Sequence, residues 1–306
     1  MNILVTGSSG FIGTALVKSL IDQGYEVSCI IRPNSPSDTN NVNLLRIKDN
    51  SIESFKSVLK SKTFDFVINL ASYGVKRGDT DLKNIIDGNI TFLSNLISSL
   101  VNKPKMIINT GSCSEYGFIK KGMHIDESAP LLPINLYGAA KSATTLIGNS
   151  LAINHNIKFI SLRLFGVYGE GEASYRLLPY VVKNLKKNLE IDLTSGEQQR
   201  DILYIDDVVN AFHSAIQNYK KIPSNASYNI CSGIPVRVRD FIEYIAKQMN
   251  KSTGLLKWGS IERRDEPQWV VGNNALFKKY TNWKPKITMQ EGIERAIGII
   301  DFQDSH

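Results

Sequence analysis

A glycine-rich turn at the start of the chain constrains its fold more than any other feature. Asn2-Ile3-Leu4-Val5 is a short apolar run, and it leads directly into Thr6-Gly7-Ser8-Ser9-Gly10-Phe11-Ile12-Gly13. Apolar residues then recur at helical spacing as far as Gly24. A strand, a glycine turn and a helix in this order open a βαβ unit, which is the building block of a parallel sheet.

The glycines of this turn also predict a ligand. Gly7 permits a tight turn, Gly10 lets a pyrophosphate approach the backbone, and Gly13 lets the helix pack close to the strand. The helix N-terminus offers unpaired N–H groups and a positive dipole end to phosphates. We therefore predict a dinucleotide site, with an ordinary turn of small residues as the alternative. The contacts expected from this segment are Gly7, Ser9, Gly10, Phe11, Ile12 and Gly13.

The end of the next strand, Val27 to Ile31, indicates which dinucleotide binds. A carboxylate there would accept hydrogen bonds from the adenosine ribose and favour NAD, whereas a basic residue favours the 2′-phosphate of NADP. This chain has Arg32 and Ser35 there, and no carboxylate before Asp38. Both side chains can hydrogen-bond a phosphate. We predict NADP(H) as the cofactor, with a solvent-facing arginine as the alternative.

Short apolar strands alternate with helical segments through the first half of the chain. Strands are expected at residues 66–70, 106–110 and 159–164, and helices at about 81–100 and 136–155. This rhythm predicts an α/β fold with a Rossmann-type doubly wound parallel sheet. After Gly166 the pattern loosens. We expect residues 1–165, with about 201–232, to form an NADP-binding domain, and residues 166–200 and 233–306 to form a smaller C-terminal substrate-binding region.

Composition and charge narrow the possible partners. The 306 residues are 42% hydrophobic and carry a net charge of +7 without a long basic block. We expect no nucleic-acid partner, because no zinc finger, basic helix or RNA-reading motif is present. Three distant cysteines and four unclustered histidines predict neither a disulfide framework nor a metal site. Without a signal segment or a membrane-spanning apolar run, the expectation is a cytoplasmic protein with no membrane contact.

Tyr137 and Lys141 are the candidates for proton transfer. They lie four residues apart, so a helix places both on one face. A free phenol titrates near pH ~10, and an ammonium ~4 Å away at an effective dielectric of ~20 would lower that pKa by roughly 3 units. Ser112 follows the strand at 106–110, and ligands of a doubly wound sheet bind at strand carboxyl ends. Its hydroxyl can therefore hydrogen-bond a substrate oxygen, although it could also cap a turn.

Together these motifs resemble one family, the extended short-chain dehydrogenase/reductases, and most closely its nucleotide-sugar 4-ketoreductases. The similarity runs over nearly the whole chain. Its marks are the glycine turn, Asn69-Leu70-Ala71-Ser72, Asn89, Ser112 before Tyr116-Gly117, Tyr137 with Lys141, Arg163 to Gly169, Gly196 to Asp201, Tyr204 to Val208 and Arg263 to Pro267.

The resemblance assigns roles residue by residue. It implies that Ser112, Tyr137 and Lys141 form the catalytic set. It also implies cofactor contacts from Asp49 at the adenine pocket and from Leu70, Ala71, Ser72, Asn89, Tyr137 and Lys141. Substrate contacts are implied for Ser112, Ser114, Arg200 and Arg263, the two arginines holding the diphosphate of a nucleotide sugar. Surface charge, or pairing with Asp201 or Glu266, is the alternative role of these arginines. A homodimer through the helices at 81–100 and 136–155 is expected.

Departures from the family pattern narrow the reaction. Cys113 and Ser114 stand where 4,6-dehydratases carry an Asp-Glu pair, so dehydration is not expected. Gly166 replaces a common Asn, which puts one usual sugar contact in doubt. Two reactions remain: NADPH-dependent reduction of a 4-keto (6-deoxy)sugar nucleotide in bacterial-type surface-polysaccharide synthesis, or NAD-dependent 4-epimerisation. Arg32 favours reduction. A non-catalytic NADP sensor is a third hypothesis, which the intact Ser112, Tyr137 and Lys141 set disfavours.

Overall fold

A seven-stranded, all-parallel sheet forms the centre of the molecule. The computed structural model describes residues 1–33, 42–76, 78–262 and 266–303. Within these ranges the sheet has the order β11-β6-β5-β4-β1-β2-β3. Its strands are β1 (Asn2–Thr6), β2 (Glu26–Ile31), β3 (Asn43–Arg46), β4 (Phe66–Asn69), β5 (Met106–Ser112), β6 (Phe159–Leu164) and β11 (Ala226–Ile230). The predicted Rossmann-type doubly wound sheet is therefore confirmed.

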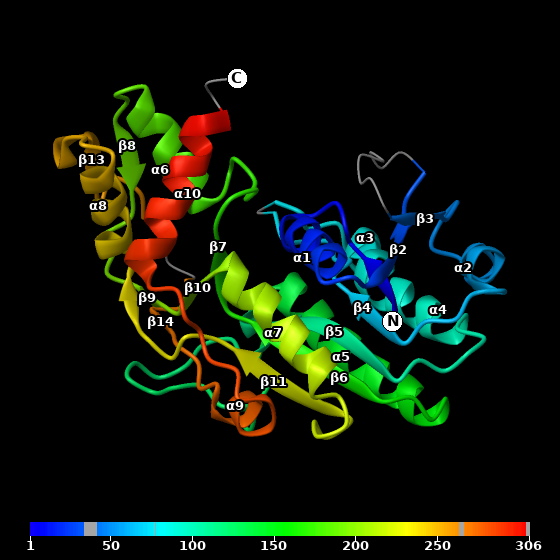
Figure 1. Cartoon of the computed structure of the whole chain (residues 1–306). Coiled ribbons are helices and arrows are strands. Elements are labelled where there is room, and N and C mark those ends of the chain that lie inside the picture. The colour runs from blue at the N-terminus through cyan, green and yellow to red at the C-terminus, as the bar shows by residue number, and fades with distance from the viewer. Residues whose placement is uncertain (34–41, 77, 263–265, 304–306) are drawn as a thin grey trace.

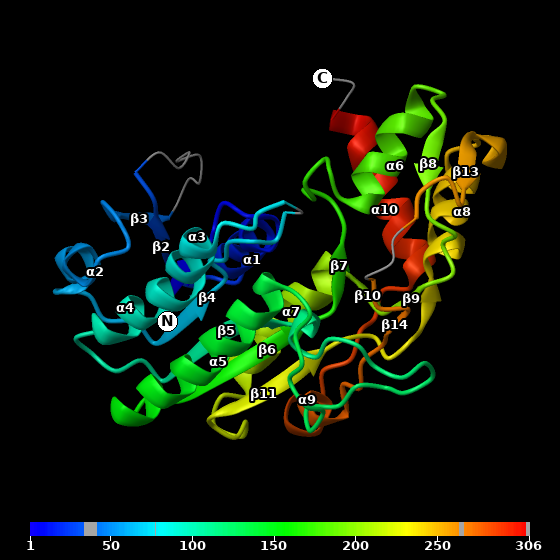
Figure 2. The same cartoon turned by 180° about the vertical axis from the view of Figure 1, so that it is seen from behind.

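Helices cover both faces of this sheet. Figure 1 shows α1 (Phe11–Asp22) and α7 (Ile205–Gln217) on one face, and Figure 2 shows α3 (Leu82–Ile85), α4 (Phe92–Ser98) and α5 (Leu136–Asn154) on the other. The short α2 (Ile52–Leu59) lies near the β3 edge. Side chains alternate along a strand, so Ile3 and Val5 pack in one apolar cluster with α1 and α7, while Leu4 packs in another with α2, α4 and α5.

The helix expected at 81–100 contains a turn that the sequence pattern did not predict. Between α3 and α4 the residues Ile86–Thr91 form a π-helical segment, η1. Asn89 lies inside it and is buried. Its side-chain amide donates to the carbonyl oxygens of Ile85 (2.8 Å) and Tyr73 (3.0 Å). These bonds tie the widened turn to the loop that follows β4, and π-turns of this kind often occur at functional sites.

The later part of the chain builds a smaller region beside the sheet (Figure 1). Three helices gather there: α6 (Leu177–Lys186), α8 (Val238–Gln248) and α10 (Met289–Gln303). Short strands pair as β10 (Ile202–Tyr204) with β7 (Gly166–Tyr168), and as β13 (Leu256–Trp258) with β8 (Ile191–Leu193). A third small sheet has the order β12 (Val236–Arg237), β9 (Gln199–Arg200), β14 (Trp269–Val270). Helix α9 (Ala275–Thr281) and the 3₁₀ turns η2 (Cys113–Glu115) and η3 (Thr253–Leu255) complete the elements.

The strand order fixes where a ligand can bind. Strand β1 lies between β2 and β4, so the chain runs outward from β1 in both directions. In doubly wound sheets the crevice at this switch point, at the carboxyl ends of the strands, is the binding site. Here those ends carry the glycine turn after Thr6 and the loop after Asn69.

Candidate active site

The glycine turn has the geometry of a phosphate cradle. Gly7 adopts a φ of +70°, and a Cβ there would lie 2.7 Å from the backbone nitrogen of Ala71. A Cβ at Gly13 would lie 2.1 Å from the Gly7 carbonyl oxygen. At Gly10, by contrast, a Cβ would approach only that oxygen, at 3.4 Å. Gly7 and Gly13 are therefore required by close packing, whereas Gly10 leaves an open side to the turn.

A cavity of about 400 Å³ lies against this open side. Its walls come from the glycine turn, the end of β2, the loop after β4 and the π-turn, and they include Gly7, Gly10, Arg32, Asn50, Ala71 and Gly88. Helix α1 begins at Phe11 with no side-chain cap on its N-terminus. Its first N–H groups are therefore available to an anion. The residues present fit a dinucleotide with its phosphates at the turn.

Three cofactor contacts were predicted after β2 and β3, and one of them lines this cavity. Arg32 is exposed and lines it, whereas Ser35 lies outside the described residues. Asp49 is exposed and accepts a hydrogen bond from the backbone nitrogen of Ser51 at 2.9 Å. Its neighbours Ile47 and Asn50 line the cavity. Phe11 and Ile12, in the first turn of α1, are half-buried against the core.

The loop after β4 forms the wall nearest the expected reaction centre. Leu70, Ala71 and Ser72 all line the cavity. Asn89 instead lies behind this wall, since its side-chain oxygen accepts from the Ser72 hydroxyl at 2.9 Å and its amide is bonded to backbone carbonyls. The structure thus places Asn89 where it orients Ser72, while the predicted direct contact with a cofactor stays a prediction.

Ser112, Tyr137 and Lys141 converge at the end of β5. Ser112 is the last residue of that strand, and Tyr137 and Lys141 lie in the first two turns of α5. The helix approaches closely because residue 138 is glycine: a Cβ there would lie 2.3 Å from the Ser114 carbonyl oxygen. Asn135 caps α5 by accepting from the Gly138 nitrogen at 2.8 Å. The Lys141 ammonium lies 5.9 Å from the centre of the Tyr137 ring.

Hydrogen bonds define the direction of the Ser112 side chain. Its hydroxyl oxygen accepts from the backbone nitrogen of Ser114 at 3.1 Å, and its own nitrogen donates to Glu115 at 2.8 Å. The Ser112 side chain also hydrogen-bonds Tyr137, so the serine and the phenol face the same place. Lys141 is buried, and its ammonium donates to the Thr110 carbonyl oxygen at 2.8 Å. That bond anchors the lysine to the same strand as the serine.

The pKa of Tyr137 differs from the sequence-based expectation. Burial raises it to about 12, although nearby Ser112 and Ser72 side chains oppose the shift by hydrogen bonding. Burial also lowers the pKa of Lys141 to about 8, with the Glu115 carboxylate acting in the opposite direction. The predicted depression of the phenol's pKa is therefore absent from the protein alone. The reason is that desolvation dominates and the ammonium points at Thr110.

Of the two arginines predicted to contact the diphosphate, Arg200 is the one that lies within the described residues. Its guanidinium donates to Glu266 at 2.8 Å, which is one of the pairings expected as an alternative role. The same positive charge lowers the pKa of Cys113, the residue after Ser112, against the dominant effect of burial. Arg200 therefore lies close to the catalytic strand end. Arg263 lies outside the described residues. Ser114 is half-buried beside Ser112.

Two departures noted in the sequence have a structural basis. A Cβ at Gly166 would lie 2.8 Å from the Asp201 carbonyl oxygen, so the β7–β10 pairing leaves no room for a side chain there. Burial raises the pKa of the Cys113 thiol to about 12, and the residue packs against an apolar cluster with Tyr116, Phe165 and Cys231. Cys113 thus remains a thiol in its packing role.

Two further groups near the site were not singled out from the sequence. Glu115 is fully buried and bonds the Ser112 nitrogen, and Arg163 of β6 pairs with it at 2.9 Å. A signal for the first was present, since Ser112-Cys113-Ser114-Glu115 has the Ser-x-x-Glu spacing of a capping box. A signal for Arg163 was its place in an otherwise apolar strand, because a charged side chain that is buried is almost always paired.

Comparison with known proteins defines the class of this protein. Residues 3–231 match the model of the NAD dependent epimerase/dehydratase family. The chain belongs to that family.

Individual relatives are similar over nearly the full length. CDP-abequose synthase of Salmonella typhimurium is 31% identical, covering 96% of this chain and 97% of the relative. The dTDP-4-dehydro-6-deoxyglucose reductase of Escherichia coli is 25% identical, covering 96% of each chain. Among solved structures, UDP-glucose 4-epimerase of Thermotoga maritima, crystallised with UDP-glucose, superposes with a TM-score of 0.89 at 23% identity over 99% of each chain.

The described residues contain neither a metal-binding cluster nor a membrane-spanning helix. Within residues 1–33, 42–76, 78–262 and 266–303, no three His, Cys, Asp or Glu side chains are grouped to hold a metal ion. In the same part of the chain, no helix has the length and apolarity needed to cross a bilayer.

Proposed function

We propose that this protein is an NADPH-dependent reductase of the 4-keto group of a nucleotide-activated (6-deoxy)sugar. The observation that carries this proposal is the convergence of Ser112, Tyr137 and Lys141 beside Ser72, which lines the cavity of the glycine cradle. The similarity to CDP-abequose synthase and to dTDP-4-dehydro-6-deoxyglucose reductase supports a nucleotide-sugar substrate. Cys113 and Ser114 supply no acid pair for elimination, so the chemistry is limited to hydride and proton transfer.

Each catalytic residue has one task in this reaction. The Ser112 hydroxyl donates to the carbonyl oxygen at C4 and polarises it. Tyr137 gives its phenolic proton to that oxygen and is afterwards reprotonated from water. When bound, NADPH supplies the hydride that reduces the carbon. Because its pKa is raised to about 12, Tyr137 holds the proton at neutral pH, which is the form that reduction consumes. Lys141 contributes positive charge next to the phenolate that remains.

Arg32 supports NADP(H) over NAD(H). It is exposed at the end of β2 and lines the cavity where an adenosine ribose would lie. A guanidinium at this position binds a 2′-phosphate through charge-assisted hydrogen bonds. The residues proposed to hold the dinucleotide are those of the cradle, the β4 loop, Arg32 and Asp49, together with Ser35.

An NAD-dependent 4-epimerase is the second candidate. The same three residues would serve it, and the fold match to UDP-glucose 4-epimerase is equally compatible with either reaction. Epimerisation removes a hydride and a proton from the sugar and later returns both, so Tyr137 would act first as a base and then as an acid. The position of Arg32 favours reduction.

The proposal includes the arrangement around the site. Residues 1–165 with about 201–232 bind the cofactor, and residues 166–200 and 233–306 bind the substrate, with Arg200 and Arg263 at its diphosphate. The substrate chemistry favours a cytoplasmic role in making sugars for surface polysaccharides such as an O-antigen. A homodimer would form through α5 and the segment from α3 to α4. Both present exposed apolar side chains, including Leu82, Ile86, Leu146 and Ile153.

The test is incubation with NADPH and a panel of 4-keto-6-deoxy sugars carried on CDP, GDP, dTDP or UDP. We expect one of them to consume NADPH in a 1:1 ratio with sugar, seen as loss of nicotinamide absorbance. Interconversion of two sugars without net loss of NADPH would identify the epimerase instead.

A further inference from the structure

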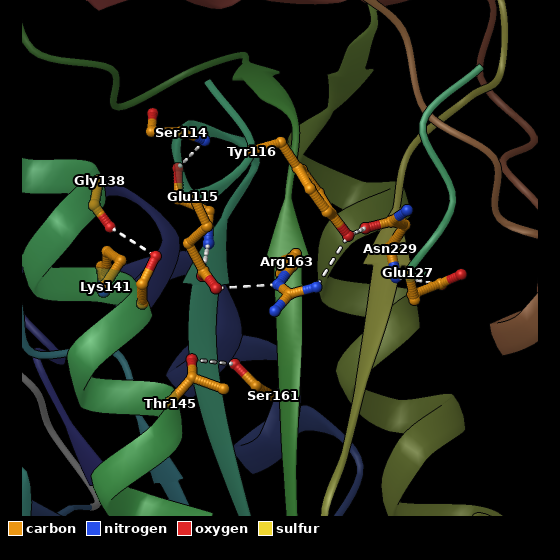
Figure 3. A network of polar contacts seen from close by, with 12 residues as sticks. Ser114, Glu115, Tyr116, Glu127, Gly138, Lys141, Thr145, Ser161, Arg163 and Asn229 are labelled. Carbon is orange, nitrogen blue, oxygen red and sulfur yellow. Dashed lines mark hydrogen bonds and ion pairs between the residues drawn. The ribbon is translucent and has the colours of Figure 1, made fainter. Parts of the chain in front are cut away.

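A buried chain of polar groups runs from the catalytic serine across three strands of the sheet. Figure 3 shows its members Glu115, Tyr116, Arg163 and Asn229. This chain of polar groups begins at Ser112 on β5, passes through Arg163 on β6 and reaches Asn229 on β11. Its central pair is Glu115 and Arg163, whose side chains are 0% and 6% exposed. None of these links touches the expected position of the cofactor, so the network is additional to the proposed chemistry.

Glu115 binds the catalytic serine with one oxygen and the arginine with the other. Its Oε1 accepts from the Ser112 nitrogen at 2.8 Å, and its Oε2 accepts from Arg163 Nε at 2.9 Å. The carboxylate is therefore held at both oxygens and cannot rotate. Gly111 provides the room for it, because a Cβ there would lie 2.6 Å from Glu115 Oε1. The bond from Glu115 to the Ser112 nitrogen thus fixes the backbone turn that orients the Ser112 hydroxyl.

The chain continues from Arg163 toward the substrate side of the molecule. Arg163 Nη1 donates to the Tyr116 hydroxyl at 2.9 Å, which in turn donates to Asn229 Oδ1 at 2.7 Å. Asn229 then donates from its side chain to the Ile125 carbonyl oxygen at 2.9 Å and from its backbone nitrogen to Glu127 at 2.7 Å. This path links the serine to the segment around Ile125.

That segment is joined directly to the residues next to Arg200. Ile125 exchanges backbone hydrogen bonds with Val271 (2.9 Å) and Asn273 (2.8 Å). Between these two residues, the Gly272 nitrogen donates to the buried carboxylate of Asp201 at 3.2 Å. The catalytic hydroxyl and the expected diphosphate contact therefore share one hydrogen-bonded framework.

Stability alone gives no reason for such a network. A buried ion pair is often no more stabilising than apolar side chains of the same volume, because desolvation offsets the attraction. What a paired carboxylate adds is direction, since its hydrogen bonds fix the angles of the groups that it holds. We propose that Glu115 and Arg163 are positioning residues that hold Ser112 in line with the substrate carbonyl. This inference rests on the proposed function and identifies what orients its polarising group.

The same pair acts on the lysine of the site. The negative charge of Glu115 raises the pKa of Lys141 against the effect of burial. It also raises the pKa of Tyr137. Removing that charge lowers both values, so the lysine loses its proton at a lower pH. This effect is independent of any substrate and provides a separate way to detect the role of Glu115.

Two variants and one control separate positioning from simple stability. Glu115→Gln retains one acceptor but turns an amide N–H group toward Arg163, so one of the two bonds is lost. The double variant E115L/R163M removes both charges and keeps an apolar volume, so its melting temperature is expected to stay near wild type. Thr145→Val is the control, because it removes a buried bond to Ser161 (3.1 Å) between α5 and β6 without touching Ser112.

The first readout is turnover of the accepted 4-keto sugar. For both E115Q and E115L/R163M we expect kcat to fall about 100-fold, the loss typical of a misplaced reacting group, with the KM for NADPH nearly unchanged. The control is expected to keep the wild-type kcat. If the double variant recovers both folding and full activity, the pair is only structural and the inference is wrong.

The second readout is the pKa of Lys141, followed by the ¹³C shift of its Cε during a pH titration and assigned with Lys141→Arg. We expect it to fall in E115Q, together with the alkaline limb of the pH–rate profile. An unchanged Lys141 pKa would contradict the inference. If the wild type turns over no sugar of the panel, the proposed function fails, and the titration still tests whether the Glu115 charge acts on the site.

Discussion

Ser112, Tyr137 and Lys141 are each held by a different kind of contact. Ser112 is fixed by its own capping box, Tyr137 by the close approach of α5 at Gly138, and Lys141 by a hydrogen bond to Thr110. In the proposed reaction Tyr137 delivers the proton, while Ser112 donates a hydrogen bond and Lys141 donates to the backbone. The three side chains are therefore not interchangeable.

Tyr137→Phe is the most selective change at this scale. The ring and its packing beside Gly74 remain, while the proton donor is lost. We expect kcat to fall by roughly 10³-fold or more, within the range that general acid catalysis contributes. NADPH binding, measured by fluorescence titration, should change less than about threefold, since none of the phosphate contacts is altered. Retained activity in this variant would exclude Tyr137 as the acid.

Arg32→Asp tests the cofactor preference. The substitution removes the guanidinium and places a carboxylate where a ribose would hydrogen-bond. We expect the ratio of kcat/KM for NADPH over NADH to drop by about 100-fold, corresponding to roughly 2.7 kcal/mol of lost phosphate contact. Arg32→Lys is the matched control and should retain most of the preference. A wild type that already prefers NADH would contradict the assignment.

Most of the predicted site residues were identified from short sequence motifs. The glycine turn and the Tyr137–Lys141 spacing reflect local geometry, so a sequence can display them. The partners of Arg163 could not be predicted, because Glu115 and Tyr116 belong to the turn after β5, whereas Arg163 lies in β6, and they meet only when the sheet forms. The pKa of Tyr137 also depends on burial, which the spacing of two residues does not reveal.

The packing of α1 against α7 depends on a buried histidine. His213 of α7 is 4% exposed, and its Nε2 lies 2.9 Å from the Ser19 hydroxyl of α1. The Tyr25 ring stacks on it with a centroid distance of 6.3 Å. Its Nδ1 has no hydrogen-bond partner among the described residues. Burial lowers the pKa of His213, so the folded protein holds this ring neutral.

This histidine predicts a pH-dependent stability. Its folded-state pKa lies below the unfolded value near 6.5, so the unfolded chain takes up a proton first as the pH falls. Stability from this group is present above pH ~6.5 and is lost below it, by at most about 1.4 kcal/mol per pH unit. Urea unfolding at pH 7.5 and 5.5 should show a larger loss for wild type than for His213→Gln. Comparing the two proteins removes the stability change that comes from other titrating groups, such as Glu172, whose pKa is raised to about 7 by burial. Equal losses would rule out a role for His213.

Element types followed from periodicity, but their fine geometry did not. The helix expected at 136–155 is present as α5, and strand β5 runs two residues beyond the expected end to include Ser112. The π-turn at Ile86–Thr91 was not predicted, because its cause is the bonding of Asn89 to the Tyr73 loop. Helical periodicity in the sequence cannot reveal such a contact.

At the scale of the whole molecule, the proposed dimer accounts for apolar side chains left exposed on one face. Leu146 of α5 is 59% exposed and Leu82 of α3 is 56% exposed. Leu146→Glu places a charge in the expected contact and should convert a dimer to a monomer in light scattering coupled to gel filtration. Val101→Glu, at another exposed apolar position (62% exposed) outside these helices, is the control and should leave the mass unchanged. A monomeric wild type would contradict the proposed interface.

The Rossmann sheet was predictable because five of its strands, β1, β2, β4, β5 and β6, are contiguous apolar segments and the first leads into the glycine turn, whereas β3 and β11 were not predicted. The smaller region beside the sheet was harder to predict, because its strands are only two or three residues long. They also pair across large separations in sequence, as Val236 with Arg200 and Leu256 with Ile191. Short strands of this kind leave no periodic pattern.

The central claim is a net transfer of hydride from NADPH to C4 of a nucleotide sugar. The most direct measurement uses NADPH deuterated at the transferred position of nicotinamide C4, a 4-keto sugar nucleotide accepted in the panel, and NMR of the product. We expect one deuterium at the sugar C4 for each NADPH consumed, and none with Tyr137→Phe. A product without deuterium at C4, or sugar interconversion without consumption of NADPH, would contradict it.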